Sequence, residues 1–539
     1  MKISGKVIDL HLRSIYGAVV TIGDGRILDI TRRDDVPERF IMPGLIDAHV
    51  HIESSMATPG SFAVEAVRHG TVAVVTDPHE IANVMGIEGV RFMIEDARRV
   101  PLRFVFGAPS CVPATPVESS GARLDSTDVG ALLKDPDIGF LSEMMNFPGV
   151  LGDDPEIMEK LKMARHYSKP VDGHAPGLTG GELEKYISAG ISTDHECTSL
   201  EEAREKIKIG MKVLIREGSA ARNLTALHAL IDESPEMVMI CSDDIHPDDL
   251  ERGHIDQIFR KLLAWGHNLF DLIMVASVNP ATHYRTGTGL LREGDSADFI
   301  VIDNLENFTV LSTFIAGREV FGDGVVKFGY ERVSAVNRFV CSSINTGDII
   351  TDVSGKRIRI IEAYDGLLNT GKREEIVHMP ARTVHNTGDD ILKIVVKERY
   401  NDAPPAVGFV KGFGLKHGAM ASSVAHDSHN IIAVGTNDAD IAGAVNRVVQ
   451  MKGGLAWHCG PEEIFLPLEI AGIISAEPVA MVSQKYRNLT LRAVNAGSAL
   501  RAPYMTLSFM ALLVIPRLKI GDRGLFDVEE FGTVPLFVD

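Results

Sequence analysis

The chain has 539 residues, more than one hydrophobic core usually fills, so we expect one large domain with at least one smaller companion. Hydrophobic residues make up 45% and charged residues 24%, an ordinary balance for a folded enzyme, which excludes disordered and fibrous classes. The formal net charge of -19, without any basic block, argues against nucleic acid and anionic membranes as partners.

The cysteines and the apolar stretches indicate the compartment. Five scattered cysteines form no C-x-x-C pair, which is typical of a reducing cytoplasm. The first residues carry no signal-like apolar core, and the most apolar stretch, residues 505–515, is too short to span a bilayer. We therefore expect a cytoplasmic protein that does not insert into a membrane.

Short β-like segments lie on both sides of a long central region. The first group precedes residue 42 and the second follows residue 286, and both show strand-like patterns. The segments are residues 6–10, 18–22, 26–30, 298–303 and 308–316. We expect the two groups to pair into one β-sandwich that is contiguous only in space.

Between these groups, short β-branched runs alternate with longer helical stretches, the pattern of βα units around a parallel sheet. Eight such runs occur, and eight is the number that closes an α/β fold into a (β/α)8 TIM-type barrel. They are residues 45–52, 72–76, 103–108, 138–143, 170–174, 191–195, 212–216 and 238–242. Barrel enzymes carry their chemistry at the carboxyl ends of the strands, so the residues that end these runs are the candidates for a site.

The remainder of the chain is expected to form a separate C-terminal α+β domain, with strands at 358–363 and 391–397 and a helix at 438–450. A polar cluster and a glycine-containing stretch stand out within it: His426, Asp427, His429 and His458, and Gly412-Phe413-Gly414-Leu415. A lone glycine-rich stretch is weak evidence for a phosphate site. If this domain folds over the barrel mouth, these residues could close the pocket or reach a neighbouring subunit. Ordinary loop and turn roles are the more frequent ones, and we do not expect ligation. The expected domains are 1–42 and 286–330 for the two parts of the β-sandwich, 43–285 for the barrel and 331–539 for the C-terminal domain.

Two histidines end the first barrel run, in His49-Val50-His51. Alternation along a strand places residues 49 and 51 on the same inward face, so two imidazoles converge on one point. Imidazole and carboxylate groups are ligands of zinc, iron and manganese. Further ligand-type residues end other runs: Glu143, His174, His195 and Asp243. A single such histidine is more often a packed core residue, but six ligand-type side chains around one barrel mouth predict a metal site.

This arrangement resembles the amidohydrolase superfamily, whose members carry His-x-His on strand one, histidines on strands five and six, and an aspartate on strand eight. The resemblance implies a metal site built from His49, His51, Glu143, His174, His195 and Asp243. Glu143 stands where many binuclear members have a carbamylated lysine, which argues against a hydantoinase-like or urease-like enzyme. Gly177, three residues after His174, stands where mononuclear cytosine and adenosine deaminases carry a catalytic glutamate, which argues against their mechanism.

Longer stretches are similar to the bacterial adenine deaminase family over nearly the whole chain, although the N-terminal segment is shorter than in many relatives. They are residues 43–55 (PGLIDAHVHIESS), 76–83 (TDPHEIAN), 110–116 (SCVPATP), 143–146 (EMMN), 172–177 (DGHAPG), 194–197 (DHEC), 216–220 (REGSA) and 425–430 (AHDSHN). The resemblance implies hydrolysis of adenine to hypoxanthine and ammonia, a purine-salvage reaction, with two divalent cations. Mn2+ or Fe2+ is expected, and Zn2+ is a third candidate. The alternative substrate is a modified purine such as N6-methyladenine.

In the mechanism that this resemblance implies, a hydroxide that bridges the two cations adds to C6 of adenine. Asp243 is the expected catalytic residue that accepts the hydroxide proton and helps to pass it toward the leaving amine. The ring nitrogen also needs a proton or hydrogen-bond donor. The candidates for this donor are Asp77, His79, Glu80 and Glu118, which the sequence does not rank. We place His79 and Glu118 among the catalytic residues, and Asp77 and Glu80 among the residues that contact the substrate. The segment from Asp77 to Glu80 is also a good helix start, and both roles are compatible.

Arg216 ends the seventh run and either orients the substrate or pairs with its neighbour Glu217. The pairing is the more frequent role of such residues, and we keep Arg216 as a candidate for substrate contact. The expected ligand is a small purine base, and symmetric homo-oligomers are the commonest state of soluble enzymes. Two rival hypotheses are a catalytically silent metal-binding scaffold, which would lack a ligand, and a hydrolase of cyclic amides or lactones, which would release no ammonia.

Overall fold

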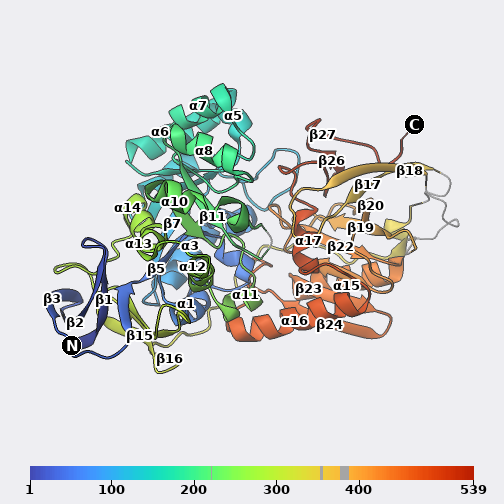
Figure 1. Ribbon diagram of the computed structural model, residues 1–539. Coiled ribbons are helices and arrows are strands. Elements are labelled where there is room, and N and C mark those ends of the chain that lie inside the picture. Colours follow the sequence, from blue (N-terminus) through green and yellow to red (C-terminus); the bar gives the residue numbers. More distant parts are fainter. Residues whose placement is uncertain (220, 352–355, 377–387, 539) are drawn as a thin grey trace.

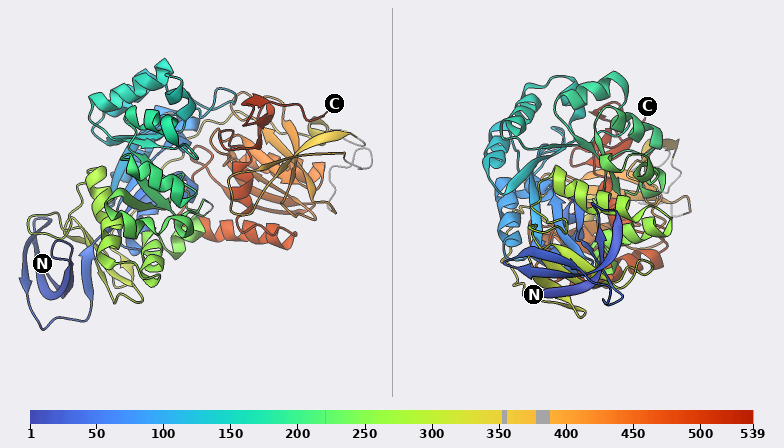
Figure 2. Two further views of the ribbon diagram at one scale, coloured as in Figure 1. Left: turned by 45° about the horizontal axis from the view of Figure 1, so that its top comes forward. Right: turned by 60° about the vertical axis from the view of Figure 1, so that its left-hand side comes forward.

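The computed structural model describes residues 1–219, 221–351, 356–376 and 388–538. Figure 1 shows a barrel with a β-sheet beside it and a C-terminal lobe packed against the barrel. The barrel lies between the N-terminal sheet and the C-terminal lobe (Figure 2). Residue 220, which ends the stretch 216–220 quoted above, lies outside the described residues. Among the helices of the described ranges, none is both long and apolar enough to cross a membrane.

Eight short strands form the barrel, one at each of the eight runs in the sequence, so the predicted TIM-type barrel is confirmed. They are β5 (Leu45–Val50), β6 (Thr71–Thr76), β7 (Arg103–Ala108), β8 (Ile138–Met144), β9 (Val171–Gly173), β10 (Thr193–Asp194), β11 (Lys212–Arg216) and β12 (Val238–Cys241). They pair in parallel within β5 to β9 and within β10 to β12. The ring closes where Val50 bridges Asp243, and where Ser192 N–H donates to Val171 O at 2.9 Å.

Helices surround these strands (Figure 1), and their starts follow from capping residues. Thr58 caps α1 by accepting a hydrogen bond from Ser61 N–H, with Pro59 in the first turn. The apolar face of α12 packs with the strands, since Phe259 and Ile240 share one cluster. The helices are α1 (Pro59–Arg68), α2 (His79–Met85), α3 (Ile87–Ala97), α4 (Ser126–Lys134), α5 (Phe147–Leu151), α6 (Pro155–His166), α7 (Gly180–Ser188), α8 (Leu200–Lys208), α9 (Leu224–Leu227), α10 (Leu230–Glu233), α11 (Pro247–Arg252), α12 (Ile255–Ala264), α13 (Leu269–Ile273) and α14 (Asn279–His283), with the short turns η1 (Ile52–Ser55), η2 (Pro235–Met237) and η3 (Met274–Val278).

One eight-stranded sheet carries strands from both flanks of the barrel, so the two groups of β-like segments pair as expected. Its order is β16-β15-β14-β13-β4-β1-β2-β3. The strands are β1 (Lys2–Asp9), β2 (Ser14–Gly23), β3 (Arg26–Arg32), β4 (Phe40–Pro43), β13 (Phe299–Ile302), β14 (Val310–Ile315), β15 (Arg318–Gly322) and β16 (Val325–Val326). The flanks meet where β4 and β13 pair antiparallel, with Ile41 opposite Val301. Val7 and Phe299, one from each flank, share an apolar cluster.

The C-terminal lobe is an α+β unit, as expected. Its main sheet has the order β18-β17-β20-β19-β22-β21-β23-β24, and a second sheet has the order β25-β26-β27. Its elements are η4 (Thr346–Ile349), β17 (Arg357–Glu362), β18 (Gly371–Ile376), β19 (Ile391–Lys397), β20 (Ala406–Lys411), β21 (Ala419–Ser422), β22 (Ile431–Gly435), α15 (Asp438–Met451), β23 (Gly454–Cys459), β24 (Glu462–Pro467), α16 (Val479–Asn495), α17 (Pro503–Phe509), β25 (Leu518–Gly521), β26 (Gly524–Asp527) and β27 (Gly532–Thr533). The two predicted strands and the predicted helix are confirmed as β17, β19 and α15.

Helix α16 joins the two lobes. Ser483 Oγ donates to Glu251 of α11 at 2.6 Å, and Arg487 binds the same carboxylate. The ring of Tyr486 lies 4.8 Å from that of His246 in a T-shaped contact. Helix α11 follows β12, on the rim formed by the carboxyl ends of the strands. The C-terminal lobe therefore docks at the end of the barrel where the candidate ligands lie.

Candidate metal centre

The six ligand-type side chains that end the barrel runs converge at the barrel mouth. The Nε2 atoms of His49 and His51 are 3.2 Å apart. Asp243 Oδ1 lies 3.3 Å from His51 Nε2 and 3.8 Å from His49 Nε2. Each of the six is buried, and they fall into overlapping groups whose ligand atoms lie within 4.8 Å of one another. The structure therefore brings all six predicted residues into one compact cluster.

Glu143, on β8, faces two sets of histidines. Its Oε1 lies 3.5 Å from His51 Nε2. Its Oε2 lies 2.8 Å from His174 Nδ1 and 3.1 Å from His195 Nε2. Burial alone would raise the pKa of Glu143, but the surrounding histidines hold it well below its usual range. A carboxylate in this position can bridge two cations through its two oxygens.

Asp243 lies two residues after the end of β12 with a left-handed backbone, at φ 56°. Its N–H donates to His49 O at 2.9 Å, and its carbonyl accepts from His51 N–H at 3.3 Å, so the end of β5 holds this strained conformation. Oδ2 accepts from Arg216 Nη1 at 2.5 Å, while Oδ1 faces the histidines. Burial alone would raise the pKa of Asp243, but Arg216 and the histidines hold it well below its usual range.

Arg216 does not pair with Glu217, so that part of the sequence interpretation is wrong. Its Nη1 and Nη2 donate to the two oxygens of Glu196, at 2.5 and 2.7 Å, whereas Glu217 binds Lys261 at 2.6 Å. Successive side chains of a strand point to opposite faces, which separates residues 216 and 217. Sequence reasoning missed Glu196, whose Oε1 lies 3.5 Å from His195 Nε2. The sequence signal that could have revealed Glu196 is an acidic residue next to a ligand-type histidine, together with an arginine at the end of the following strand.

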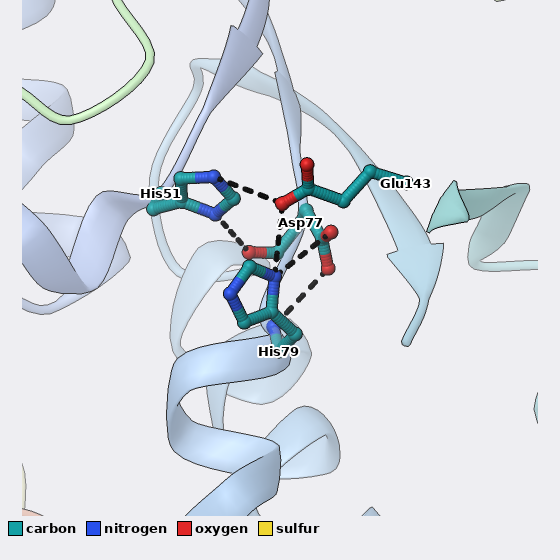
Figure 3. A group of neighbouring side chains, drawn as sticks. All are labelled: His51, Asp77, His79 and Glu143. Atoms are coloured by element: carbon teal, nitrogen blue, oxygen red, sulfur yellow. Dashed lines mark hydrogen bonds and ion pairs between the residues drawn. The ribbon is translucent and has the colours of Figure 1, made fainter. Parts of the chain in front are cut away.

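Asp77 and His79 lie on the rim after β6 (Figure 3). His79 Nδ1 lies 3.0 Å from Asp77 Oδ2 and 3.5 Å from Glu143 Oε1. Helix α2 begins at His79, as predicted, and Asp77 Oδ1 accepts from the His79 backbone N–H at 3.1 Å. Burial alone would lower the pKa of His79, but Asp77 and Glu80 raise it well above its usual value. Asp77 thus orients the imidazole toward the cluster while it supports the helix start.

Side chains of the C-terminal lobe cover the cluster. His426, Asp427 and His429 therefore take the alternative role considered for them, closure of the pocket, and not the more frequent loop and turn roles. Hydrogen bonds join Glu80 Oε1 to His426 Nδ1 and Glu80 Oε2 to His429 Nε2. The ring of Phe509 stacks on His426, with centroids 4.6 Å apart. The contact between Glu80 and His426 spans 346 residues, which is why no local pattern revealed it.

The other features singled out in this lobe keep structural roles. His458 Nδ1 lies 3.0 Å from Asp440 Oδ1 and does not join the cluster. The backbone N–H groups of Gly412 and Gly414 donate to the two oxygens of Asp390, at 2.8 and 2.7 Å. The glycine-containing stretch therefore binds a carboxylate of its own lobe.

A small cavity lies between the cluster of six ligand-type side chains and the C-terminal lobe. Its polar side is lined by His51, His79, Glu80, Glu143, His174, His195, Glu196, Arg216, Asp243, Asp244, His426 and Asp427, and its apolar side by Met145, Leu368, Phe509, Leu512, Val514 and Ile515. A cavity with convergent polar groups and one apolar wall suits a small planar ring.

Glu118 is buried but does not line this cavity. Its Oε1 accepts from Thr115 Oγ1 at 3.1 Å, and its Oε2 has no hydrogen-bond partner within the described ranges. Burial, and after it the nearby Asp427 carboxylate, raise the pKa of Glu118 to about 8. Glu118 thus lies beside Asp427, which lines the cavity, but Glu118 itself does not.

Buried polar contacts fix the loops that carry the ligand-type histidines. The Tyr186 hydroxyl accepts from His174 N–H at 3.1 Å. Lys206 Nζ donates to Ala175 O at 2.8 Å and to Asp194 Oδ2 at 2.9 Å. Ala175 follows one histidine and Asp194 precedes the other, so Lys206 ties the ends of β9 and β10 together. Supports of this kind hold ligands at fixed positions.

Comparisons with known proteins agree with the fold and identify the family. Residues 40–320 match the amidohydrolase family, so the barrel, its rim of metal-type ligands and the split sheet define an amidohydrolase, a class that uses divalent metal ions. Residues 368–532 match the adenine deaminase C-terminal domain. The chain is 51% identical to an adenine deaminase of Methanosarcina mazei, with 100% of both chains covered, and 51% identical to one of Salinibacter ruber, with 100% and 99% covered. The chain belongs to the adenine deaminase family.

Proposed function

We propose that this chain hydrolyses adenine to hypoxanthine and ammonia, with two divalent cations held by His49, His51, Glu143, His174, His195 and Asp243. The observation that carries the proposal is the position of Glu143, whose two oxygens face separate histidine sets. Mn2+ or Fe2+ are the expected cations, and Zn2+ suits the same ligands. When bound, the cations would lower the pKa of water toward neutrality, which makes it a nucleophile for C6 of the ring.

Asp243 is the proposed proton-transfer residue. Its Oδ1 faces His51 at 3.3 Å, and its Oδ2 is held by Arg216 at 2.5 Å. Because the guanidinium keeps the carboxylate ionised, Asp243 can accept a proton at neutral pH and pass it to the leaving amine. We assign Arg216 to the support of Asp243 rather than to substrate contact, since its Nη atoms already donate to Glu196 and Asp243.

His79 is the proposed hydrogen-bond donor to the ring nitrogen on which negative charge develops. It lines the cavity, and the Asp77 and Glu80 carboxylates beside it raise its pKa, which favours the protonated, donating imidazole. Asp77 and Glu80 flank the imidazole, with Oδ2 of Asp77 3.0 Å from Nδ1 and Oε1 of Glu80 3.5 Å from Nε2, so we assign them to its orientation. Glu118 is the weaker candidate because it lies outside the cavity.

Adenine is favoured over N6-methyladenine because the relatives matched along the full chain are named adenine deaminases. We further propose the domain limits 1–42, 43–285, 286–330 and 331–539, a homo-oligomeric state and a cytoplasmic location. The net charge of -19 supports the absence of nucleic-acid and membrane partners.

Ammonia release from adenine by metal-stripped protein, with and without added Mn2+, tests the reaction. We expect Mn2+ to restore release, and Asp243→Asn to lower kcat by about 100- to 10000-fold, the range of a lost general acid–base group. Glu143→Gln should lower the number of cations bound per chain. The exposed Asp402→Asn is the control and should keep wild-type activity. Release that survives metal stripping, or an active Asp243→Asn variant, would contradict the proposed mechanism. Methylamine release from N6-methyladenine at an equal rate would contradict the substrate assignment.

A further inference from the structure

Asp427 lines the cavity with a carboxylate that has one unsatisfied oxygen. The residue is 3% exposed and lines the cavity that also holds His51 and Asp243. Among the described residues, Asp427 Oδ2 has no hydrogen-bond partner. A buried acceptor without a partner costs free energy, so a ligand that donates a hydrogen bond at this oxygen is favoured.

The neighbouring acidic side chains are already paired. Glu80 binds His426 and His429 through its two oxygens. Asp244 accepts from the Ser54 hydroxyl. One carboxylate oxygen of Asp427 and ligand atoms of Glu80 and His79 lie within 4.8 Å of one another, so the Asp427 carboxylate lies close to the proposed donor His79. Asp427 therefore offers the carboxylate that is open to a substrate at this end of the cavity.

An apolar wall adjoins this carboxylate. Phe509 ends α17, and it stacks on His426 with an interplanar angle of 11°. Phe509, Leu512 and Ile515 line the same cavity as Asp427. A planar heteroaromatic ring needs apolar contact on its face and polar contact at its edge. The C-terminal lobe supplies both of these from one side of the cavity.

We propose that Asp427 is a specificity-determining residue, whose carboxylate accepts a hydrogen bond from the ring N–H of a free purine base. The inference rests on the proposed function and adds the group that recognises the five-membered ring. A free purine base carries one N–H on that ring, whereas a purine substituted at N9, such as a nucleoside, carries none. An N9-substituted purine would leave the carboxylate buried and unpaired, and a site built for a donor rejects ligands that lack it.

Steady-state kinetics on the full-length, metal-loaded enzyme test this inference. Asp427→Asn keeps the shape and removes the charge, and Asp427→Ala removes the acceptor. We expect KM for adenine to rise about 10- to 100-fold, the range for a hydrogen bond to a charged group, with a smaller change in kcat and an unchanged metal content. Hypoxanthine binding, followed by calorimetry, should weaken by a similar factor. The preference of the wild type for adenine over 9-methyladenine should shrink in Asp427→Ala.

Three outcomes would overturn the assignment. A lower metal content in Asp427→Asn would make Asp427 a cation ligand, and a loss of kcat at constant KM would make it a proton-transfer group. A wild type that binds 9-methyladenine as tightly as adenine would also overturn it, even if neither variant folds. The control Asp440→Asn changes a carboxylate of the same lobe that binds His458 outside the cavity, and it should keep the wild-type KM. A wild type that releases no ammonia from adenine refutes the proposed function, whereas an active wild type with unchanged KM in both variants refutes this inference alone.

Discussion

Glu80 of the barrel and His426 of the C-terminal lobe are hydrogen-bond partners although 346 residues separate them. His429 binds the second oxygen of the same carboxylate. Burial alone would raise the pKa of Glu80, but His426, His429 and His79 hold it well below its usual range. One barrel carboxylate thus anchors the C-terminal lobe on the rim that carries His79.

Glu80→Gln should loosen this anchor. The substitution keeps the shape but removes the charge that two buried histidines face, and breaking a buried ion pair costs about 3–5 kcal/mol. We expect a lower free energy of unfolding in urea and a higher KM for adenine. The control is Glu463→Gln, whose partner Arg447 is 25% exposed, and its loss should stay below about 1 kcal/mol. Equal unfolding midpoints for the two variants would show that Glu80 does not anchor the lobe.

Lys206→Met should destabilise the barrel. The Lys206 and Asp194 side chains are both 0% exposed, and the substitution leaves the Asp194 carboxylate without its cation. We expect a loss of about 3–5 kcal/mol in the free energy of unfolding. We also expect weaker metal binding, because Ala175 and Asp194 no longer share the hydrogen bonds of Lys206. Urea unfolding and metal analysis measure the two effects. Lys185→Met, which removes an exposed pair with Asp153, serves as the control, and a matching loss there would refute the explanation.

Arg216→Lys should lower kcat by about 10- to 100-fold with little change in KM, the range for lost support of a ligand. A lysine ammonium cannot bind both Glu196 oxygens and Asp243 in the planar geometry of the guanidinium. Steady-state kinetics at saturating Mn2+ give the two constants separately. If KM rises while kcat stays constant, Arg216 contacts the substrate and the sequence assignment is restored.

Lys519 should make stability depend on pH. It is fully buried, Nζ donates to Phe509 O at 2.9 Å, and burial lowers its pKa from 10.5 to about 7. Between pH 7 and 10.5 the unfolded chain binds a proton that the folded chain does not, so this lysine makes stability rise with pH in that window. The free energy of unfolding of Lys519→Met minus that of wild type, both measured in urea, should therefore be larger at pH 6 than at pH 9. An identical difference at both pH values would contradict the lowered pKa of Lys519. Lys411→Met is the matched control.

The barrel and its rim could be predicted from sequence because both follow from short-range order. Each strand is a short β-branched run, and a strand's period of two fixes which residues face inward, as His49 and His51 do. Parallel strands bring their carboxyl ends to one rim, so the positions of Glu143 and Asp243 followed from topology alone.

The C-terminal contribution could not be predicted in this way. His426 and Phe509 reach the cavity because the C-terminal lobe docks on the barrel, through Glu80 and through the contacts of α16 with Glu251 of α11. No periodicity encodes the docking of one lobe on another. Glu196 was missed for a related reason, since its partner Arg216 lies on the next strand and becomes visible only when the barrel closes.

The pairing of β4 with β13 also bears on how the chain folds as it is synthesised. The residue facing Pro43 in that pairing is Phe299, so the ribosome must complete all eight barrel strands before the edge of β4 is covered. Until then, the sheet formed by β1 to β4 has an open edge at β4 that another nascent chain could join. The strand that covers the edge of β4 is therefore synthesised only after the whole barrel.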